Sequence, residues 1–385
     1  MRETAADIAP TPANDEPPVD AGAAETMETT EEAGAPLPKE ECFDPERSAV
    51  IGVVIVEDGR GASPEAAIRS AGEGRPVVYA TSDASSQAAV IARRAGATIA
   101  EIDGREPVTG GRARNAGYRQ LKALAPDIDY VQFLVAGSAM HPDWLASAAR
   151  FMARRPEVAV VAGATGERYP KPSIFAAAGL GASVFPGEAQ AVGPLVFARV
   201  EGFETAGGFR NDLVAGETDD LCLRLRRRGR HVWRLDAPMA VREMQPSNLG
   251  GWWRSAVGRG FDFAYAAALH GRAPERYRAL ETARAVFWGG LYPAIVFGAA
   301  AACAGAIYVL DLSFSPLLAA AAIIALGCSV YVGLWLWIAL RRGVRKSGSG
   351  LYGFFAALRH VPEFFGVLKF WLGPNKPSRE KGSAA

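Results

Sequence analysis

A short charged helix is predicted by the stretch Gly216-Glu217-Thr218-Asp219-Asp220-Leu221-Cys222-Leu223-Arg224-Leu225-Arg226-Arg227-Arg228-Gly229. Leu221 and Leu225 are four residues apart and therefore share one face of a helix. Acidic residues open the stretch and arginines close it, which suits the helix dipole, and Gly229 is a typical C-terminal cap. An ordinary surface helix has the same pattern. The function of this stretch therefore has to be inferred from the sequence around it.

Upstream of this helix, apolar runs alternate with helical segments. Ala49–Val56 and Tyr130–Val135 are continuous, largely β-branched or aromatic runs of the kind found in buried parallel strands. Further strands are predicted at Pro76–Ala80 and Thr98–Ile102, and helices at about 63–72, 85–95 and 112–124. Such alternation predicts an α/β fold with a mostly parallel sheet, which binds ligands at the carboxyl ends of its strands.

The C-terminal third has a different composition. Ala285–Leu310 and Leu317–Leu340 are nearly uncharged, and each is long enough to cross a bilayer as a helix. The short connection between them contains no basic residue, whereas arginines and a lysine flank the two outer ends. The positive-inside rule therefore predicts that the globular domain is cytoplasmic. Leu351–Leu372 mixes large apolar residues with a few charges and predicts an amphipathic helix at the membrane interface.

These patterns divide the 385 residues into four parts. We predict a disordered acidic tail at 1–48, an α/β domain at 49–275, two transmembrane helices within 276–346, and an interfacial helix with a polar tail at 347–385. The net charge of +1 does not identify a partner, and we expect no nucleic-acid partner. The four cysteines are far apart, which favours reduced, structural thiols over a metal or redox site.

Four segments between residues 112 and 254 resemble, in order and spacing, motifs of bacterial family 2 glycosyltransferases. They are Arg112-Ala113-Arg114-Asn115-Ala116-Gly117, Val131-Gln132-Phe133-Leu134 with Pro142-Asp143-Trp144-Leu145, Gly207-Gly208-Phe209, and Trp252-Trp253-Arg254. The resemblance implies a Rossmann-like GT-A domain on the cytoplasmic side of a bacterial inner membrane. It also implies transfer of a sugar from a nucleotide sugar to a lipid-linked or polysaccharide acceptor.

The same resemblance suggests site residues. The helix at 216–229 looks like the acceptor-side motif of the family, whose carboxylates include the general base. Glu217, Asp219 and Asp220 are therefore the candidate catalytic residues. The candidate nucleotide-sugar-binding residues are Arg112, Arg114, Asn115 and Asp83, and the two arginines could bind a diphosphate by charge-assisted hydrogen bonds.

Several positions depart from the family pattern. Val135-Ala136-Gly137 replaces the metal-binding DxD motif, and none of these side chains can ligate Mg²⁺ or Mn²⁺. We therefore expect no bound metal cofactor. Thr81 stands where an aspartate would contact the base of the nucleotide, Pro194 replaces the aspartate of a GGD motif, and Thr218 replaces the general base.

Two hypotheses remain open at this point. The first is an active transferase that works without the metal of the family. The second is a catalytically inactive relative that binds a saccharide or serves as a partner of an active paralogue at the membrane. A membrane scaffold whose spans carry the function is disfavoured, because neither span contains an ionisable residue of the kind that marks a transport pathway.

Overall fold

The computed structural model describes residues 49–57, 61–104, 108–167, 186–242, 248–342 and 349–374. The predicted acidic tail at 1–48 and the polar end at 375–385 lie outside the described residues. Both stay predictions.

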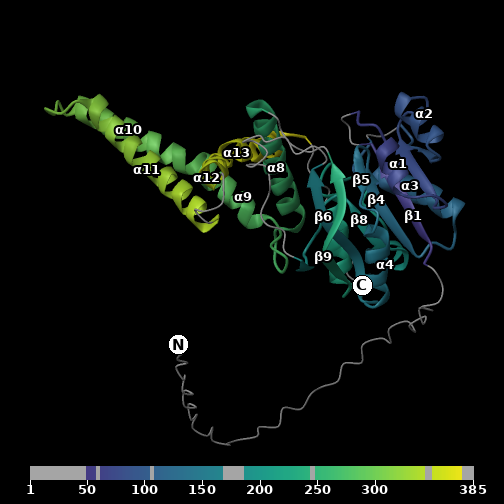
Figure 1. The fold of residues 1–385 in the computed structure, drawn as a ribbon. Coiled ribbons are helices and arrows are strands. Elements are labelled where there is room, and N and C mark those ends of the chain that lie inside the picture. The colour runs from purple at the N-terminus through teal and green to yellow at the C-terminus, as the bar shows by residue number, and fades with distance from the viewer. Residues whose placement is uncertain are drawn as a thin grey trace, which may run out of the picture. The chain divides into compact units, whose positions relative to one another are not determined.

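A nine-stranded mixed sheet forms the core of the α/β domain (Figure 1). Parallel strands occupy one side, in the order β3 (Thr98–Glu101), β2 (Val77–Thr81), β1 (Ile51–Val56) and β4 (Tyr130–Val135). The sheet continues with β8 (Val196–Arg199), β6 (Val158–Glu167), β9 (His231–Arg242) and β5 (Ser138–Met140), and β7 (Gly187–Glu188) pairs with β9. β8 is antiparallel to both of its neighbours, whereas β6 and β9 are parallel. The predicted α/β class is confirmed.

Helices pack against the parallel strands and set the position of their carboxyl ends. All six residues of β1 are buried, as its uninterrupted apolar sequence predicts. The helix α3 (Gly110–Leu124) packs on β1 and β2, and a Cβ at Gly117 would lie 2.4 Å from a methyl of Val54. Glycine at this position therefore lets the helix approach the sheet. The remaining helices of the domain are α1 (Glu65–Ser70), α2 (Gln87–Arg94), α4 (Trp144–Ala153), α6 (Val200–Thr205) and α7 (Glu217–Arg227).

The helix α7 is the one predicted at 216–229. Gly216 and Gly229 flank it with positive φ angles of 71° and 74°, which glycine adopts without strain. Leu221 and Leu225 are buried in the main core, and the acidic residues lie in its first turn. The predicted amphipathic pattern is confirmed, and the helix points its acidic end toward the start of α3.

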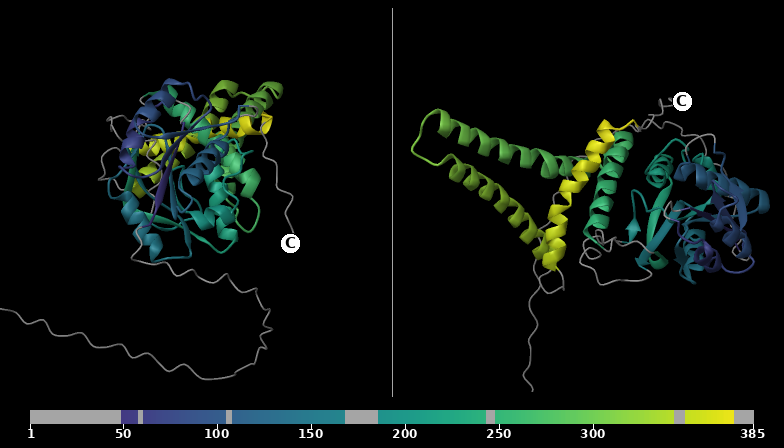
Figure 2. Two further views of the ribbon diagram at one scale, coloured as in Figure 1. Left: turned by 90° about the vertical axis from the view of Figure 1, so that its right-hand side faces the viewer. Right: turned by 90° about the horizontal axis from the view of Figure 1, so that it is seen from above.

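Two long apolar helical segments follow the domain. Ala279–Val309 has 31 residues and Pro316–Arg341 has 26, and the most apolar 18-residue windows within them have mean hydropathies of 1.7 and 2.3. The first comprises α9 (Ala279–Val286), the π-helical turn η1 (Phe287–Leu291) and α10 (Tyr292–Val309), and the second lies in α11 (Pro316–Arg342). α10 and α11 pack side by side (Figure 2), and leucines such as Leu317 remain largely exposed. Both segments are long and apolar enough to cross a membrane.

The segment predicted as one interfacial helix forms two, α12 (Ser349–Leu358) and α13 (His360–Leu372). The break falls at Arg359, because Pro362 has no N–H to donate to the Leu358 carbonyl. α13 packs along α8 (Leu249–His270), and α12 packs against α11. A helix pair, rather than one surface helix, therefore connects the apolar helices to the domain.

Candidate active site

The candidate donor side lies at the carboxyl ends of β1 and β2. Thr81 is fully buried, and its hydroxyl donates a hydrogen bond of 3.1 Å to the Glu57 carboxylate. The Asp83 carboxylate accepts hydrogen bonds from the backbone N–H and the hydroxyl of Ser85, at 2.8 and 2.6 Å, and these bonds lower the pKa of Asp83. Asp83 is therefore engaged in the turn that leads into α2. It remains exposed to solvent.

The turn after β4 does not fit a divalent metal ion. Val135, Ala136 and Gly137 supply no side-chain oxygen, and the Ser138 hydroxyl donates to the Val135 carbonyl. The Gly137 N–H donates to the Ser63 carbonyl at 3.2 Å. Across the described ranges, no three His, Cys, Asp or Glu side chains are grouped so that they could hold a metal. The residues present therefore do not support a metal-bound diphosphate at this turn.

Arg114 connects the start of α3 to the start of α7. Its side chain is 4% exposed and forms an ion pair with Glu217, which is 15% exposed. The guanidinium also donates to the carbonyls of Gly110 and Pro194, at 3.2 and 3.3 Å, and lies 5.5 Å from the centre of the Phe209 ring. Arg114 thus holds the Glu217 carboxylate in place, and the same contacts withdraw it from solvent.

Asn115 and Arg112 have different surroundings. The Asn115 amide donates to the Phe209 carbonyl at 2.6 Å and accepts from the Phe209 N–H at 3.0 Å. Asn115 therefore fixes the Gly207-Gly208-Phe209 turn against α3, which is a positioning role. Arg112 lies at the start of α3, is half-buried and donates to the Asp103 carbonyl at 3.3 Å.

The two aspartates of α7, Asp219 and Asp220, have different hydrogen-bond partners and therefore different roles. Asp220 is 1% exposed and contacts Arg224 at 2.8 Å and His270 at 3.1 Å. Burial alone would raise the pKa of Asp220, but the hydrogen bonds from His270 and Arg224 lower it. Asp219 accepts a hydrogen bond of 2.8 Å from Tyr277, and burial raises its pKa. Asp220 is therefore held as a structural anion, whereas Asp219 is the more basic of the two.

A carboxylate that the sequence motifs did not indicate approaches the same place from α8. Asp262 reaches solvent but is surrounded by many protein atoms and by the charges of Asp219 and Glu217. Burial and these two carboxylates raise the pKa of Asp262 to about 6, against the opposing effect of Arg278. Only its position on α8, which packs on α7, brings Asp262 to the site. Sequence spacing gave no signal for it.

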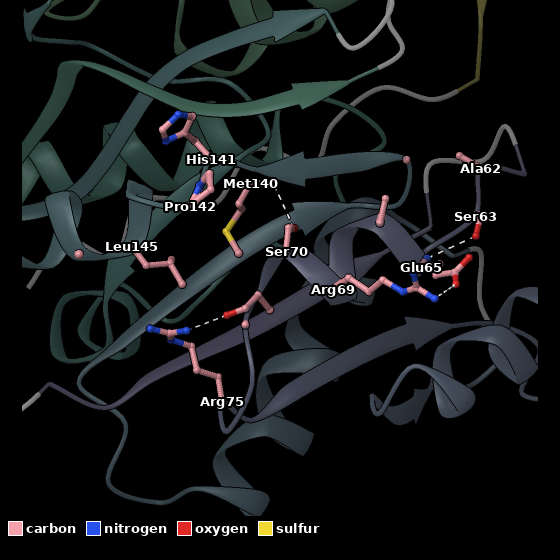
Figure 3. A pocket seen from close by; sticks show the side chains of 15 residues that line it. Ala62, Ser63, Glu65, Arg69, Ser70, Arg75, Met140, His141, Pro142 and Leu145 are labelled. Carbon is pink, nitrogen blue, oxygen red and sulfur yellow. Dashed lines mark hydrogen bonds and ion pairs between the residues drawn. The ribbon is translucent and has the colours of Figure 1, made fainter.

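A cavity of about 920 Å³ lies beside the turn after β4, between α1 and the start of α4 (Figure 3). Its polar groups bond mainly to one another: Arg69 to Glu65 at 2.6 Å, and Arg75 to the Ala71 carbonyl at 2.9 Å. Gly137 lines it, whereas Glu217, Asp219 and Asp262 do not. The cavity is therefore distinct from the carboxylate cluster at α7.

The carboxylate cluster can bind a polyol and accept a proton from it. Glu217, Asp219 and Asp262 provide hydrogen-bond acceptors, and Tyr277 and Arg278 provide donors beside them. The raised pKa values of Asp219 and Asp262 bring two carboxylates closer to neutral pH, which suits general bases. Thr218 lies between these acids in the sequence, is buried and has no ionisable group.

The fold has counterparts among solved structures. A mannosyltransferase from Pyrobaculum calidifontis, PcManGT in complex with GDP-Man and Mn²⁺, has a TM-score of 0.50 at 18% identity. The match covers 86% of this chain and 89% of that one, more than residues 1–275 could supply, so it extends into the C-terminal helices.

Two further structures match over less of this chain. TarS from S. aureus has a TM-score of 0.40 at 12% identity, covering 62% of this chain and 43% of that one. Glucosyl-3-phosphoglycerate synthase from Mycobacterium tuberculosis has a TM-score of 0.33 at 15% identity, covering 51% and 73%. No protein-family model and no curated protein matches the sequence. The chain has the fold of a GT-A glycosyltransferase.

Proposed function

We propose that this protein transfers a sugar from a nucleotide-sugar donor to a membrane-proximal saccharide or lipid-linked acceptor. The observation that carries the proposal is the cluster of Glu217, Asp219 and Asp262 at the opening of α7, in a GT-A fold. The structural neighbour PcManGT was solved with a nucleotide sugar, GDP-Man, which supports a donor of that class.

In this proposal Asp262 is the general base, with Asp219 as its alternative. A transferase needs a carboxylate to remove the proton of the acceptor hydroxyl as the new glycosidic bond forms. Thr218 stands at the family's base position and cannot do this near neutral pH. Asp262 enters the same cluster from α8 and is open to solvent, so an acceptor can reach it. Arg114 then has a positioning role through Glu217.

The donor side must neutralise the departing nucleoside diphosphate without the DxD ligands. At this edge Arg112 lies half-buried at the start of α3, whereas Arg114 is 4% exposed and paired with Glu217. We therefore propose Arg112, together with backbone N–H groups at the first turn of α3, as the diphosphate contact.

An inactive, saccharide-binding partner of an active paralogue is the second candidate. Two observations favour it. The carboxylates of Glu217, Asp220 and Asp83 are each bound by neighbouring protein groups. In addition, the turn after β4 has no side chain that could bind a metal ion. Such a protein would bind acceptor saccharide without turnover.

The two candidates differ in product formation. We would reconstitute the full chain in lipid vesicles and supply a panel of labelled nucleotide sugars with bacterial lipid extract or oligosaccharide as acceptor. Transfer of label to an acceptor, with release of nucleoside diphosphate, is the expected result. Saccharide binding without any transfer, from protein shown to be folded, would favour the inactive candidate.

A further inference from the structure

A second charged cluster lies away from the candidate active site, between α8 and α13. Glu363 is only 2% exposed and is approached by three basic side chains. Arg259 and Arg359 each place Nε at 3.6 Å from one carboxylate oxygen, and His360 places Nδ1 at 3.2 Å from the other. We call these four residues the Glu363 cluster.

The Glu363 cluster has more positive charge than its carboxylate can balance. One carboxylate faces two guanidinium groups and an imidazole, so the cluster has a net charge of at least +1. The contacts of 3.6 Å are too long for hydrogen bonds. Within the described part of the chain, the Nε atoms of both arginines, His360 Nδ1 and Glu363 Oε1 are buried without a hydrogen-bond partner although they face one another, and so is Nη2 of Arg259. Buried donors without partners are costly, which indicates that a further acceptor belongs here.

The cluster lies beside the bases of both apolar helical segments. The Gly289 Cα lies against the His360 carbonyl, where a Cβ would be only 2.0 Å from the oxygen, and Gly290 packs on the Phe364 ring. On the other side, α12 contacts α11 through a hydrogen bond of 2.7 Å from Trp335 to the Gly350 carbonyl. The cluster therefore occupies the level at which the chain passes from the domain into its apolar helices.

Aromatic side chains mark the same level. Trp288, Tyr292 and Tyr331 form a contacting group at the bases of α10 and α11, and Trp335 packs on Phe354 of α12. Tryptophan and tyrosine concentrate where a membrane meets water, at the depth of the lipid headgroups. If the two apolar helices cross a membrane, the Glu363 cluster faces lipid phosphates.

We infer that the Glu363 cluster binds the phosphate group of a membrane lipid. Glu363 lies 3.6 Å from Nε of both arginines, and their side chains, 31% and 38% exposed, leave the cluster partly open to solvent. Two guanidinium groups arranged in this way can bind the oxygens of one phosphate. The site rests on the membrane anchoring of the chain but not on sugar transfer, so it is tested without a donor.

The experiment titrates the full chain, in a neutral maltoside detergent, with dioctanoyl phosphatidic acid and measures binding by calorimetry. Dioctanoyl glycerol has the same acyl chains without the phosphate, and inorganic phosphate has the anion without the chains. We expect saturable binding of the phosphatidic acid and at least tenfold weaker binding of each control. Equal binding of dioctanoyl glycerol, or equal binding of inorganic phosphate, would overturn the inference.

Substitutions then locate the site. Arg259→Gln and Arg359→Gln are each expected to weaken phosphatidic acid binding by about tenfold, the loss of one charge-assisted hydrogen bond. Arg254→Gln removes the same charge from an exposed position on α8 outside the cluster, and should leave the affinity within about twofold. Arg359 lies half-buried at the junction of α12 and α13, so Arg359→Gln provides the test if Arg259→Gln does not fold. Unchanged affinity in folded Arg359→Gln protein would contradict the inference.

Discussion

Asp262 is the residue on which the proposed chemistry depends. It shares a cluster with Asp219 and Glu217, and burial together with these charges raises its pKa from 3.8 to about 6. We expect Asp262→Asn to lower the transfer rate by about 10²–10⁴-fold, the usual contribution of a general base. Asp127 precedes β4, at the amino-terminal end of that strand and so away from the proposed site. Asp127→Asn removes an exposed carboxylate there and should leave the rate unchanged. Equal rates for wild type and Asp262→Asn would exclude Asp262 as the base.

The pH dependence of activity and of stability should run in opposite directions. A base must be deprotonated, so the transfer rate should rise as the pH rises through about 6. The folded-state pKa of Asp262 lies above its unfolded value, so the folded protein binds the proton more tightly. The stability contributed by this group is full below about pH 4 and is lost as the pH rises through about 6. At pH 7.5, Asp262→Asn should therefore raise the melting temperature, by an amount that solvent screening keeps small. A lower melting temperature would contradict this account of the site.

Breaking the buried ion pair between Arg114 and Glu217 is expected to lower the free energy of unfolding. Glu217→Gln would leave a guanidinium that is 4% exposed without its anion, and should cost about 3 kcal/mol of the free energy of unfolding. The double variant Arg114→Met with Glu217→Gln removes both charges and should recover part of that loss. Urea unfolding of the three proteins measures the effect. Additive losses in the double variant would show that the two side chains are not coupled.

At the residue scale, the sequence predicted where the α7 carboxylates lie, but it did not predict which side chains contact them. Gly216 to Gly229 indicated where Asp219 and Asp220 lie, but their distinguishing partners are distant in the sequence: His270 is 50 residues from Asp220, and Tyr277 is 58 residues from Asp219. Asp262 was not identified, because its role comes from the packing of α8 on α7 and not from any spacing in the chain.

At the scale of elements, the crossing of α8 and α13 is set by two glycines. A Cβ at Gly260 would lie 1.9 Å from the Glu363 carbonyl oxygen, and one at Gly366 would lie 2.0 Å from the Val257 carbonyl oxygen. These glycines let the two backbones approach closely, as small residues do where helices pack tightly. The Glu363 cluster is formed across this crossing.

Gly260→Ala should therefore separate the two helices. We expect a loss of about 1–3 kcal/mol from overpacking, and weaker phosphatidic acid binding by the Glu363 cluster. Gly258→Ala is the matched control, because a Cβ there meets nothing within 4 Å. That control should stabilise the helix by about 0.5–1 kcal/mol. Thermal unfolding of both variants in detergent tests the prediction, and similar melting temperatures would contradict it.

The elements themselves were predicted well where their sequences are strongly patterned. β4 coincides with its apolar run, β1 begins at Ile51 within the run predicted from Ala49, and α7 begins and ends near its glycines. The division of Leu351–Leu372 into α12 and α13 was not predicted, although Pro362 was the available signal. The antiparallel insertion of β8 between β4 and β6 was not predicted either, because strand order depends on long-range pairing that no local pattern encodes.

At the scale of the whole molecule, the two apolar segments predict a helical hairpin through the membrane with both of its ends on the cytoplasmic side. The loop at 311–315 would then face the opposite side. A cysteine introduced by Ser313→Cys should react with a membrane-impermeant maleimide added outside intact spheroplasts, whereas Ser255→Cys on α8 should react only after lysis. Experiments would start from a variant without the native cysteines. Labelling of Ser255→Cys in intact spheroplasts would reverse the orientation.

We propose that this GT-A fold retains a working carboxylate cluster while its donor side binds no resident metal. Calorimetry of the full chain with nucleotide sugars and nucleoside diphosphates, with Mn²⁺ present or with EDTA, tests it most directly. We predict saturable donor binding whose affinity changes less than threefold when Mn²⁺ is removed, and which Arg112→Gln weakens about tenfold. Donor binding that occurs only with Mn²⁺ would contradict the claim, since Val135, Ala136 and Gly137 offer no ligand for that ion.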